Sequence, residues 1–340
     1  MTPRSLSHAR THSASRTTSR LSQVLTLALL CACAPNLFGQ GQPTTTQPDG
    51  DEVLTVRTDL ITLPVFVTDG RGRRVGSLAA SDFAASVDGR PAEIRYFAAG
   101  TARVALVFAL DASGSARGHI ARQRAAALAL LSRFGAGSRV GVLAFAERAA
   151  LLRPISSAEL PSDSFQIDAR RNSRTAVFDG ALTSVRAFDG AGASPAERRI
   201  VVLLSDGLDT ASAARPAEVV AAARERGVSI YVIHLPLYGV RGDRIGVRRP
   251  SRGFRELAAE TGGRYFLLGD ERHALDPNPT YDLAPVFAAV ADDLQTQYVV
   301  GLYADPSARD GREHAVGVSL TRGNSKLRAH TLREKFTLKP

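Results

Sequence analysis

Hydrophobic and polar residues divide the chain into a β-rich opening, an alternating α/β middle and a β-rich close. In the opening, apolar residues stand at every second position from Ile61 to Val67, which predicts a strand with one buried face. The middle begins with a continuous apolar run at 104–110. Such a run predicts a strand buried on both faces, as in a parallel sheet.

Further apolar runs and helical spacings alternate through the middle of the chain. Strands are expected at 140–145, 200–204 and 228–235, and helices at 119–134, 216–227 and 282–296. This alternation predicts an α/β fold with a doubly wound, mostly parallel, Rossmann-like sheet. Strand patterns return at 298–303, 315–320 and 327–332. We expect the opening and closing segments to pack together as an accessory β-sandwich, because neither can bury its apolar face alone.

The length of 340 residues fits about two domain-sized units. The patterns place a leader at 1–34, a linker at 35–52, an N-terminal β-rich segment at 53–100, the α/β domain at 101–297 and a C-terminal β-rich segment at 298–340. The net charge of +10 includes four arginines in the leader. They precede an uncharged, largely apolar run at 21–34, which is the plan of an export signal.

We therefore expect an exported protein that is periplasmic, anchored to the outer membrane or secreted; a buried helix is the alternative for 21–34. Both cysteines, Cys31 and Cys33, lie in this leader, so no disulfide is expected in the mature chain. The sequence around Cys33 looks like a bacterial lipobox, which would tether the protein by a lipid on that residue. Two small apolar residues of a secretory signal are the other interpretation. No apolar run of the mature chain is long enough to span a membrane.

Hydroxyl and carboxylate side chains follow the predicted strands where each strand ends. Asp111, Ser113 and Ser115 come after the strand at 104–110, Asp206 follows the strand at 200–204, and Thr175 stands at a helix start. The carboxyl ends of parallel strands meet at one edge of a sheet, so these side chains should converge. An all-oxygen set suits Mg²⁺, with Mn²⁺ and Ca²⁺ as alternatives. Either aspartate alone would be read as a helix cap or turn residue.

This ordered set resembles the metal-ion-dependent adhesion site of von Willebrand factor type A domains, over about 103–297. The resemblance implies that the serines and the threonine bind Mg²⁺, that the aspartates act partly through water, and that a partner's carboxylate completes the shell. The flanking sequences VTDGRGRRVGSLAASDF and LQTQYVVGLY resemble a bacterial exported subfamily known as von Willebrand factor A-related domain proteins. We therefore expect a non-enzymatic adhesion protein that binds an acidic protein ligand. The alternative is an envelope structural or assembly factor whose metal site is used only within a complex or is vestigial.

Enzymatic interpretations find little support in the sequence. A haloacid-dehalogenase-type phosphatase needs a second acid two residues after its nucleophile, where this chain has Ser113, and no G-x-S-x-G motif of a serine hydrolase occurs. An arginine-rich stretch at 241–256 is either a solvated loop or a partner-binding rim beside the metal site. Its arginines are Arg241, Arg244, Arg248, Arg249, Arg252 and Arg255. Nucleic acid is not expected as a partner, because export is expected and aromatic residues do not interleave with the basic ones.

Overall fold

The computed structural model describes residues 59–100, 103–116, 123, 137–157, 167, 173–192, 197–269, 281–321 and 326–340. The chain divides into two compact units, Met1–Thr55 and Val56–Pro340, and every described residue belongs to the second. The expected leader, linker and lipid site at Cys33 therefore lie outside the described residues. So does the helix expected at 119–134, apart from Gln123.

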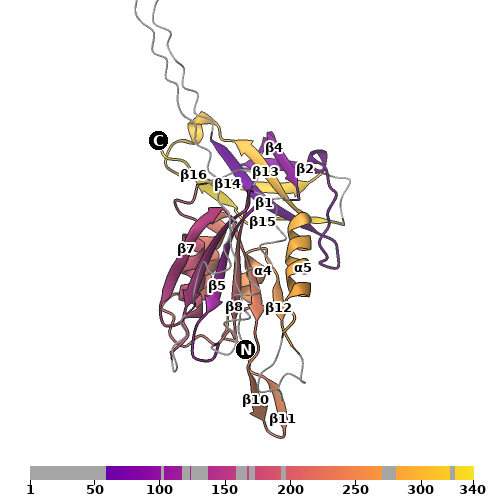
Figure 1. Cartoon of the computed structure of the whole chain (residues 1–340). Helices are drawn as coiled ribbons and strands as arrows, with labels where there is room; N and C mark the ends of the chain where they lie inside the picture. The colour runs from indigo at the N-terminus through magenta and orange to yellow at the C-terminus, as the bar shows by residue number, and fades with distance from the viewer. Residues whose placement is uncertain are drawn as a thin grey trace, which may run out of the picture. The chain divides into compact units, whose positions relative to one another are not determined.

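A six-stranded sheet forms the middle of this unit, in the order β12-β9-β8-β5-β6-β7 (Figure 1). Neighbouring strands are parallel except for β7, which runs antiparallel to β6. The strands are β5 (Val104–Asp111), β6 (Arg139–Phe145), β7 (Ala149–Ser157), β8 (Arg198–Ser205), β9 (Val228–His234) and β12 (Tyr265–Leu267). The predicted α/β fold with a mostly parallel sheet is confirmed.

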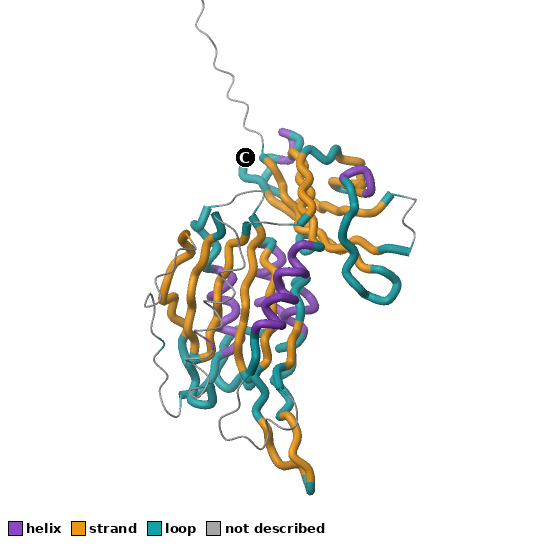
Figure 2. The backbone as a smooth tube through the Cα atoms, turned by 45° about the vertical axis from the view of Figure 1, so that its right-hand side comes forward, coloured by secondary structure: helices purple, strands orange, loops and turns teal. Residues whose placement is uncertain are grey.

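Helices cover both faces of this sheet (Figure 2). Every residue of β5 is buried, and its alternate side chains enter two separate cores. Leu106 and Phe108 pack in the core that contains residues of α5 (Ala284–Gln295), whereas Ala105 and Val107 pack in the core that contains residues of the other helices. Those helices are α2 (Val177–Arg186), α3 (Pro216–Arg226) and α4 (Glu256–Glu260). Burial on both faces explains why β5 has a continuous apolar sequence.

The opening and closing β segments form two four-stranded sheets around a shared core, as expected. In the first sheet, β1 pairs antiparallel with β13, and Leu63 lies opposite Val300. This sheet has the order β15-β1-β13-β4, with β15 (Arg328–Thr331), β1 (Leu60–Thr68), β13 (Gln297–Tyr303) and β4 (Tyr96–Ala99). The second has the order β16-β14-β2-β3, with β16 (Lys335–Thr337), β14 (Glu313–Leu320), β2 (Phe83–Val87) and β3 (Arg90–Ala92). Short 3-10 helices lie at Ala80–Asp82 and Pro306–Ala308.

In the α/β middle of the chain, four strands were not expected from the sequence: β7, β12 and the hairpin of β10 (Tyr238–Arg241) and β11 (Arg244–Val247). The hairpin extends from the end of the sheet opposite the β-sandwich (Figure 1). β7 is an edge strand and contains Pro154, which lacks an N–H and is tolerated at an edge. None of the described helices is long and apolar enough to cross a membrane.

Candidate metal site

The ends of β5 and β8 lie side by side and bring four of the five expected residues together. Asp111 is the last residue of β5, and Asp206 directly follows β8, its parallel neighbour. Ser113 and Ser115 lie in the turn after β5. The hydroxyl of Ser115 donates a 2.5 Å hydrogen bond to Oδ2 of Asp206, and the hydroxyl oxygens of Ser113 and Ser115 are 3.1 Å apart.

The Asp111 carboxylate is fully buried and accepts two hydrogen bonds. Its Oδ1 accepts the main-chain N–H of Ser113 at 2.9 Å, and its Oδ2 accepts the hydroxyl of Ser205 at 2.6 Å. Burial, and after it repulsion from Asp206, raise the pKa of Asp111 to about 6, although the hydrogen bonds from Ser113 and Ser205 act in the opposite direction. The folded protein therefore holds two buried carboxyl groups that repel each other.

Asp206 lies in a tight turn, and the loop that follows the β10–β11 hairpin packs against this turn. Oδ1 of Asp206 accepts the N–H of Leu208 at 2.8 Å. Gly207 has a φ of +75°, and a Cβ there would lie 2.6 Å from the ring of Phe254 and 2.7 Å from Pro250. Only glycine fits this position, because both the backbone conformation and the lack of space exclude a side chain.

The fifth residue, Thr175, is buried in the segment before α2 and connects two of the site's loops. Its carbonyl accepts the main-chain N–H groups of Thr210 and Ala211 at 2.8 and 3.0 Å, which joins it to the loop after Asp206. Two residues earlier, the carbonyl of Ser173 accepts the N–H of Gly114, in the turn after β5, at 3.3 Å. These contacts hold Thr175 at the same edge of the sheet.

Sequence reasoning missed two residues that hold this arrangement. Ser205 contacts Asp111, as described, and also accepts the N–H of Gly207 at 3.0 Å. Asp209 accepts the N–H of Val177 at 2.8 Å and so caps the first turn of α2. For the capping role of Asp209, the only signal in the sequence was an aspartate three residues after Asp206. Nothing in the sequence distinguishes Ser205 from an ordinary strand residue.

The chemistry of this cluster fits a hard divalent cation. Its side chains supply carboxylate and hydroxyl oxygens, which Mg²⁺ and Ca²⁺ prefer. A cation between Asp111 and Asp206 would remove their repulsion and favour the ionised form of Asp111. Within the described part of the chain, no group of three or more His, Cys, Asp or Glu side chains is arranged so that it could hold a metal ion.

The arginine-rich loop at 248–255 is fastened to the turn that carries Asp206. The N–H of Ser251 donates to the carbonyl of Gly207 at 2.8 Å, and the hydroxyl of Ser251 accepts the N–H of Asp209 at 2.9 Å. Four of the six candidate rim arginines are exposed on this loop: Arg248, Arg249, Arg252 and Arg255. Arg255 also lies over the ring of Tyr265, 5.0 Å from its centroid.

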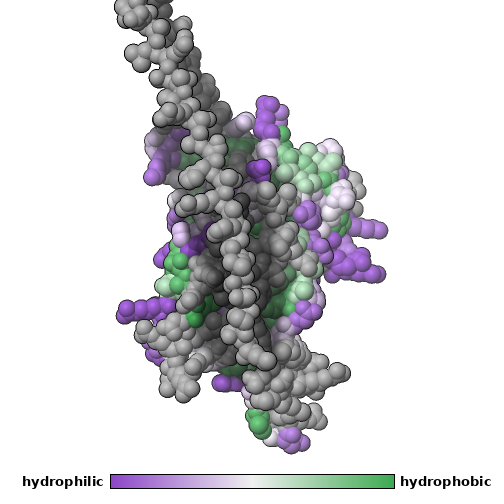
Figure 3. Space-filling view, viewed as in Figure 1, coloured by the Kyte–Doolittle hydropathy of each residue, from purple (hydrophilic) through white to green (hydrophobic). Residues whose placement is uncertain are grey.

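The other two candidate arginines, Arg241 and Arg244, are main-chain partners next to the turn of the β10–β11 hairpin. Their side chains lie outside the described residues. Val240 in the same hairpin is 77% exposed. In Figure 3 a hydrophobic spot and hydrophilic residues lie together at this end of the molecule. The rim therefore combines exposed positive charge with one exposed apolar side chain.

Comparison with protein families gives one match. The family described as the von Willebrand factor type A domain matches residues 105–276, about half of the chain and the part that contains all five candidate ligands. No curated protein matches the chain.

Several solved structures are similar to part of the chain at low sequence identity. A conserved hypothetical protein, BatB from Bacteroides thetaiotaomicron, is 19% identical, covers 56% of this chain and 97% of its own, and has a TM-score of 0.40. A von Willebrand factor type A protein from Catenulispora acidiphila is 14% identical and has a TM-score of 0.43. The match covers 83% of this chain and 74% of that protein. Proximal thread matrix protein 1 from the mussel byssus, whose metal-ion-dependent adhesion site motif is occupied by zinc, is 16% identical and has a TM-score of 0.45. The match covers 58% of this chain and 49% of that protein.

Proposed function

Because the chain belongs to the von Willebrand factor type A domain family, we propose that it is an exported binding protein that holds a partner's carboxylate through a divalent ion. Domains of this family generally serve in protein–protein interaction and adhesion and are mostly non-enzymatic. The proposed ligands of the ion are Asp111, Ser113, Ser115, Thr175 and Asp206. The observation that carries the proposal is the pair of buried, mutually repelling carboxyl groups at Asp111 and Asp206.

The proposed ion is Mg²⁺, with Mn²⁺ and Ca²⁺ as the alternatives. Domains of this family often bind a divalent metal at this position. When bound, the ion supplies a positive charge that accepts an oxygen from outside the protein. Asp111 and Asp206 balance a charge of two, and the three hydroxyls add none. An incoming aspartate or glutamate is therefore attracted, whereas a lysine is not.

The arginine loop extends this preference beyond the ion. Ser251 fastens the loop to the Asp206 turn, so Arg248, Arg249, Arg252 and Arg255 stand beside the place where the partner would bind. We include Arg241 and Arg244 in the same partner-binding rim because they belong to the adjoining hairpin. An acidic segment with several carboxylates would use one at the ion and others at the arginines.

The proposed location follows from the basic, apolar leader at 1–34, which directs export to the periplasm, to the outer membrane through a lipid on Cys33, or to the medium. A competing proposal is an envelope structural or assembly factor in which the metal site works only within a complex or is vestigial. The two differ in whether a divalent ion controls capture of a free partner.

Capture from envelope extract, with Mg²⁺ or with chelator, tests the proposal. The wild-type protein should retain a partner in Mg²⁺ and release it in chelator. Thr175→Ala and Asp111→Ala should weaken capture without changing the circular dichroism spectrum. The Asp111→Ala variant should also lose Mg²⁺ binding in calorimetric titration. Capture that ignores both the chelator and the substitutions, or equal Mg²⁺ affinity in wild type and variant, would overturn the proposal.

A further inference from the structure

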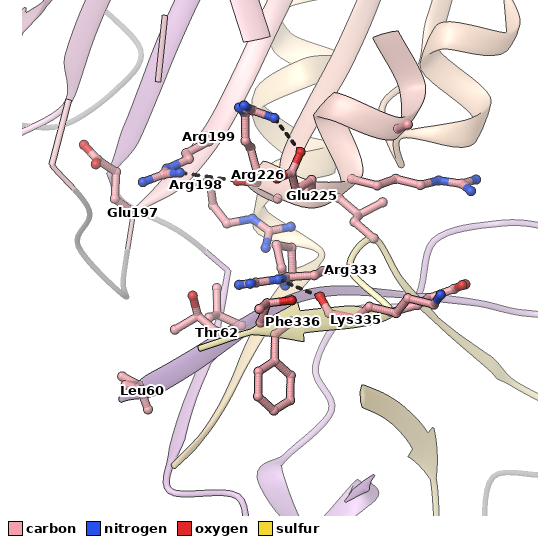
Figure 4. A pocket seen from close by; sticks show the side chains of 18 of the residues that line it. Leu60, Thr62, Glu197, Arg198, Arg199, Glu225, Arg226, Arg333, Lys335 and Phe336 are labelled. Atoms are coloured by element: carbon pink, nitrogen blue, oxygen red, sulfur yellow. Dashed lines mark hydrogen bonds and ion pairs between the residues drawn. The ribbon is translucent and has the colours of Figure 1, made fainter. Parts of the chain in front are cut away.

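A second site lies at the opposite end of the central strands from Asp111 and Asp206. There, a cleft of about 870 Å³ separates the start of β8 and the end of α3 from the β-sandwich (Figure 4). Six of the side chains that line it are cationic and five are acidic, so its formal charge is +1. Because these residues are far along β8 from Asp206, the cleft is distinct from the candidate metal site.

Most of the acidic side chains of the cleft are already paired with cations. Asp189 and Glu225 both pair with Arg226, at 2.9 and 2.8 Å. Glu313 pairs with Lys335 at 2.5 Å. Glu197 pairs with Arg139, outside the cleft lining, at 2.5 Å. These carboxylates make their ion pairs with other cations, although Glu197 and Asp189 also attract Arg199, and Glu225 attracts Arg333.

Two arginines of the cleft, Arg199 and Arg333, have only main-chain oxygens as hydrogen-bond partners among the described residues. Arg199 donates weakly to the carbonyls of Arg226 and Gly192, at 3.4 and 3.5 Å, and Arg333 donates to the carbonyl of Lys335 at 3.0 Å. They come from opposite sides, β8 and the segment before β16 (Figure 4). Most of their guanidinium N–H groups are left for another acceptor.

Charge and burial at these two arginines favour an added anion. Both side chains are partly buried, and burial lowers the pKa of each guanidinium below its usual value. Attraction to Glu225 raises the pKa of Arg333, and repulsion from Arg199 lowers it. An anion between them would remove this repulsion and accept N–H groups from both.

We propose that this cleft binds an organic carboxylate, with Arg199 and Arg333 holding the carboxylate group. The same cleft offers apolar surface at Leu60, Pro64 and Val299, which suits an apolar body attached to the charged group. A single negative charge matches a cleft of formal charge +1. A polyphosphate carries several negative charges, which exceed the formal charge of +1 of the cleft.

The test uses N-acetylphenylalanine as the probe and its uncharged amide as the control, in calorimetric titrations of the full chain. Chelator is present throughout, so that no metal ion takes the carboxylate and the outcome is independent of the proposed metal site. We expect the acid to bind at least tenfold more tightly than the amide. Inorganic phosphate, an anion with no apolar body, should bind more weakly than the acid.

Substitutions distinguish this cleft from the arginines elsewhere on the surface. Arg333→Gln and Arg199→Gln should each weaken binding of the acid at least tenfold. Arg333→Lys keeps the positive charge but loses the planar guanidinium with its paired N–H donors, so it should give an intermediate affinity. Arg224→Gln is the matched control, since Arg224 lines the same cleft but pairs with Glu260, and it should bind within twofold of wild type. Equal binding of acid and amide, no binding at millimolar probe, or unchanged affinity in a folded Arg333→Gln variant would overturn the proposal.

Discussion

Ser205 and Asp111 are joined by a fully buried 2.6 Å hydrogen bond that links the end of β8 to the end of β5. The same Ser205 oxygen accepts the N–H of Gly207 at 3.0 Å, in the turn that carries Asp206. One hydroxyl therefore fixes both carboxylates of the candidate metal site relative to each other. Ser205 is a positioning residue, because it contacts a proposed ligand and is not itself among the proposed ligands.

Replacing Ser205 by alanine should weaken both the fold and the metal site. Asp111 would lose a buried donor and Gly207 a buried acceptor, so we expect the free energy of unfolding to fall by about 1–3 kcal/mol. The Mg²⁺ affinity should also fall, because the two carboxylates are no longer held in register. Urea unfolding and calorimetric titration measure the two effects. Ser319→Ala, at an exposed position of β14 in the β-sandwich, should change neither.

The stability of the metal-free protein should depend on pH through Asp111. Its pKa is 3.8 in the unfolded chain and about 6 when folded, so the folded state binds more protons between these values. Stability is therefore greatest below about pH 4 with respect to this group and falls as the pH rises to 7, by about 3 kcal/mol. Urea unfolding in chelator between pH 4 and pH 7.5 measures the slope.

Two comparisons identify Asp111 as the source of that slope. Asp111→Asn should remove this contribution, because the amide does not titrate. Saturating Mg²⁺ should reduce it in the wild type, because the ion favours the ionised carboxylate. A slope that is the same in Asp111→Asn and wild type would show that other groups cause it.

Gly207→Ala should lower the free energy of unfolding, because the chain turns here against the loop at 250–254. The added Cβ meets Phe254 and Pro250 at 2.6 and 2.7 Å, and the φ of +75° disfavours any side chain. We expect a loss of roughly 2–4 kcal/mol in unfolding free energy, from backbone strain and overpacking together. Gly246→Ala in the nearby hairpin meets nothing within 4 Å and should lie within about 0.5 kcal/mol of wild type.

The sequence predicts which loops carry the candidate ligands, because the position of these loops follows from the topology of the sheet. Asp111 comes directly after one apolar run and Asp206 comes one residue after another, and the ends of parallel strands must share an edge. Ser205 was missed because its position at the end of an apolar run is explained equally well by a strand. Its contact with Asp111 spans 94 residues, and a single sequence contains no signal for such a pairing.

The predicted elements were accurate where periodicity was strong and incomplete where it was weak. β1 and β13 have alternating or continuous apolar residues, and their antiparallel pairing gives the expected β-sandwich core. β7 was missed because Pro154 and exposed residues, including Leu151, interrupt any alternation. The hairpin was missed because its arginines and glycines resemble a solvated loop.

A buried ionic network connects the β-sandwich to the central domain. Asp293 of α5 accepts hydrogen bonds from Arg74 at 3.1 Å, from Tyr231 of β9 at 2.8 Å and from Gln297 of β13 at 3.0 Å. Asp293 is 3% exposed, so its charge depends on these donors rather than on water. Arg74, which follows β1, also donates to the carbonyl of Gly262 at 2.9 Å.

Asp293→Ala should therefore destabilise the whole unit. The substitution leaves the partly buried guanidinium of Arg74 without its carboxylate, and breaking a buried pair in this way costs about 3–5 kcal/mol. Asp292→Ala, at the exposed neighbouring position on the same helix, is the control and should stay within about 0.5 kcal/mol of wild type. Replacing Arg74 and Asp293 together, by methionine and leucine, should recover part of the loss, because the guanidinium of Arg74 is then no longer left without its carboxylate. Urea unfolding of the wild type and the three variants measures these changes: a double variant less stable than Asp293→Ala alone would mean that the network stabilises through packing rather than through charge pairing.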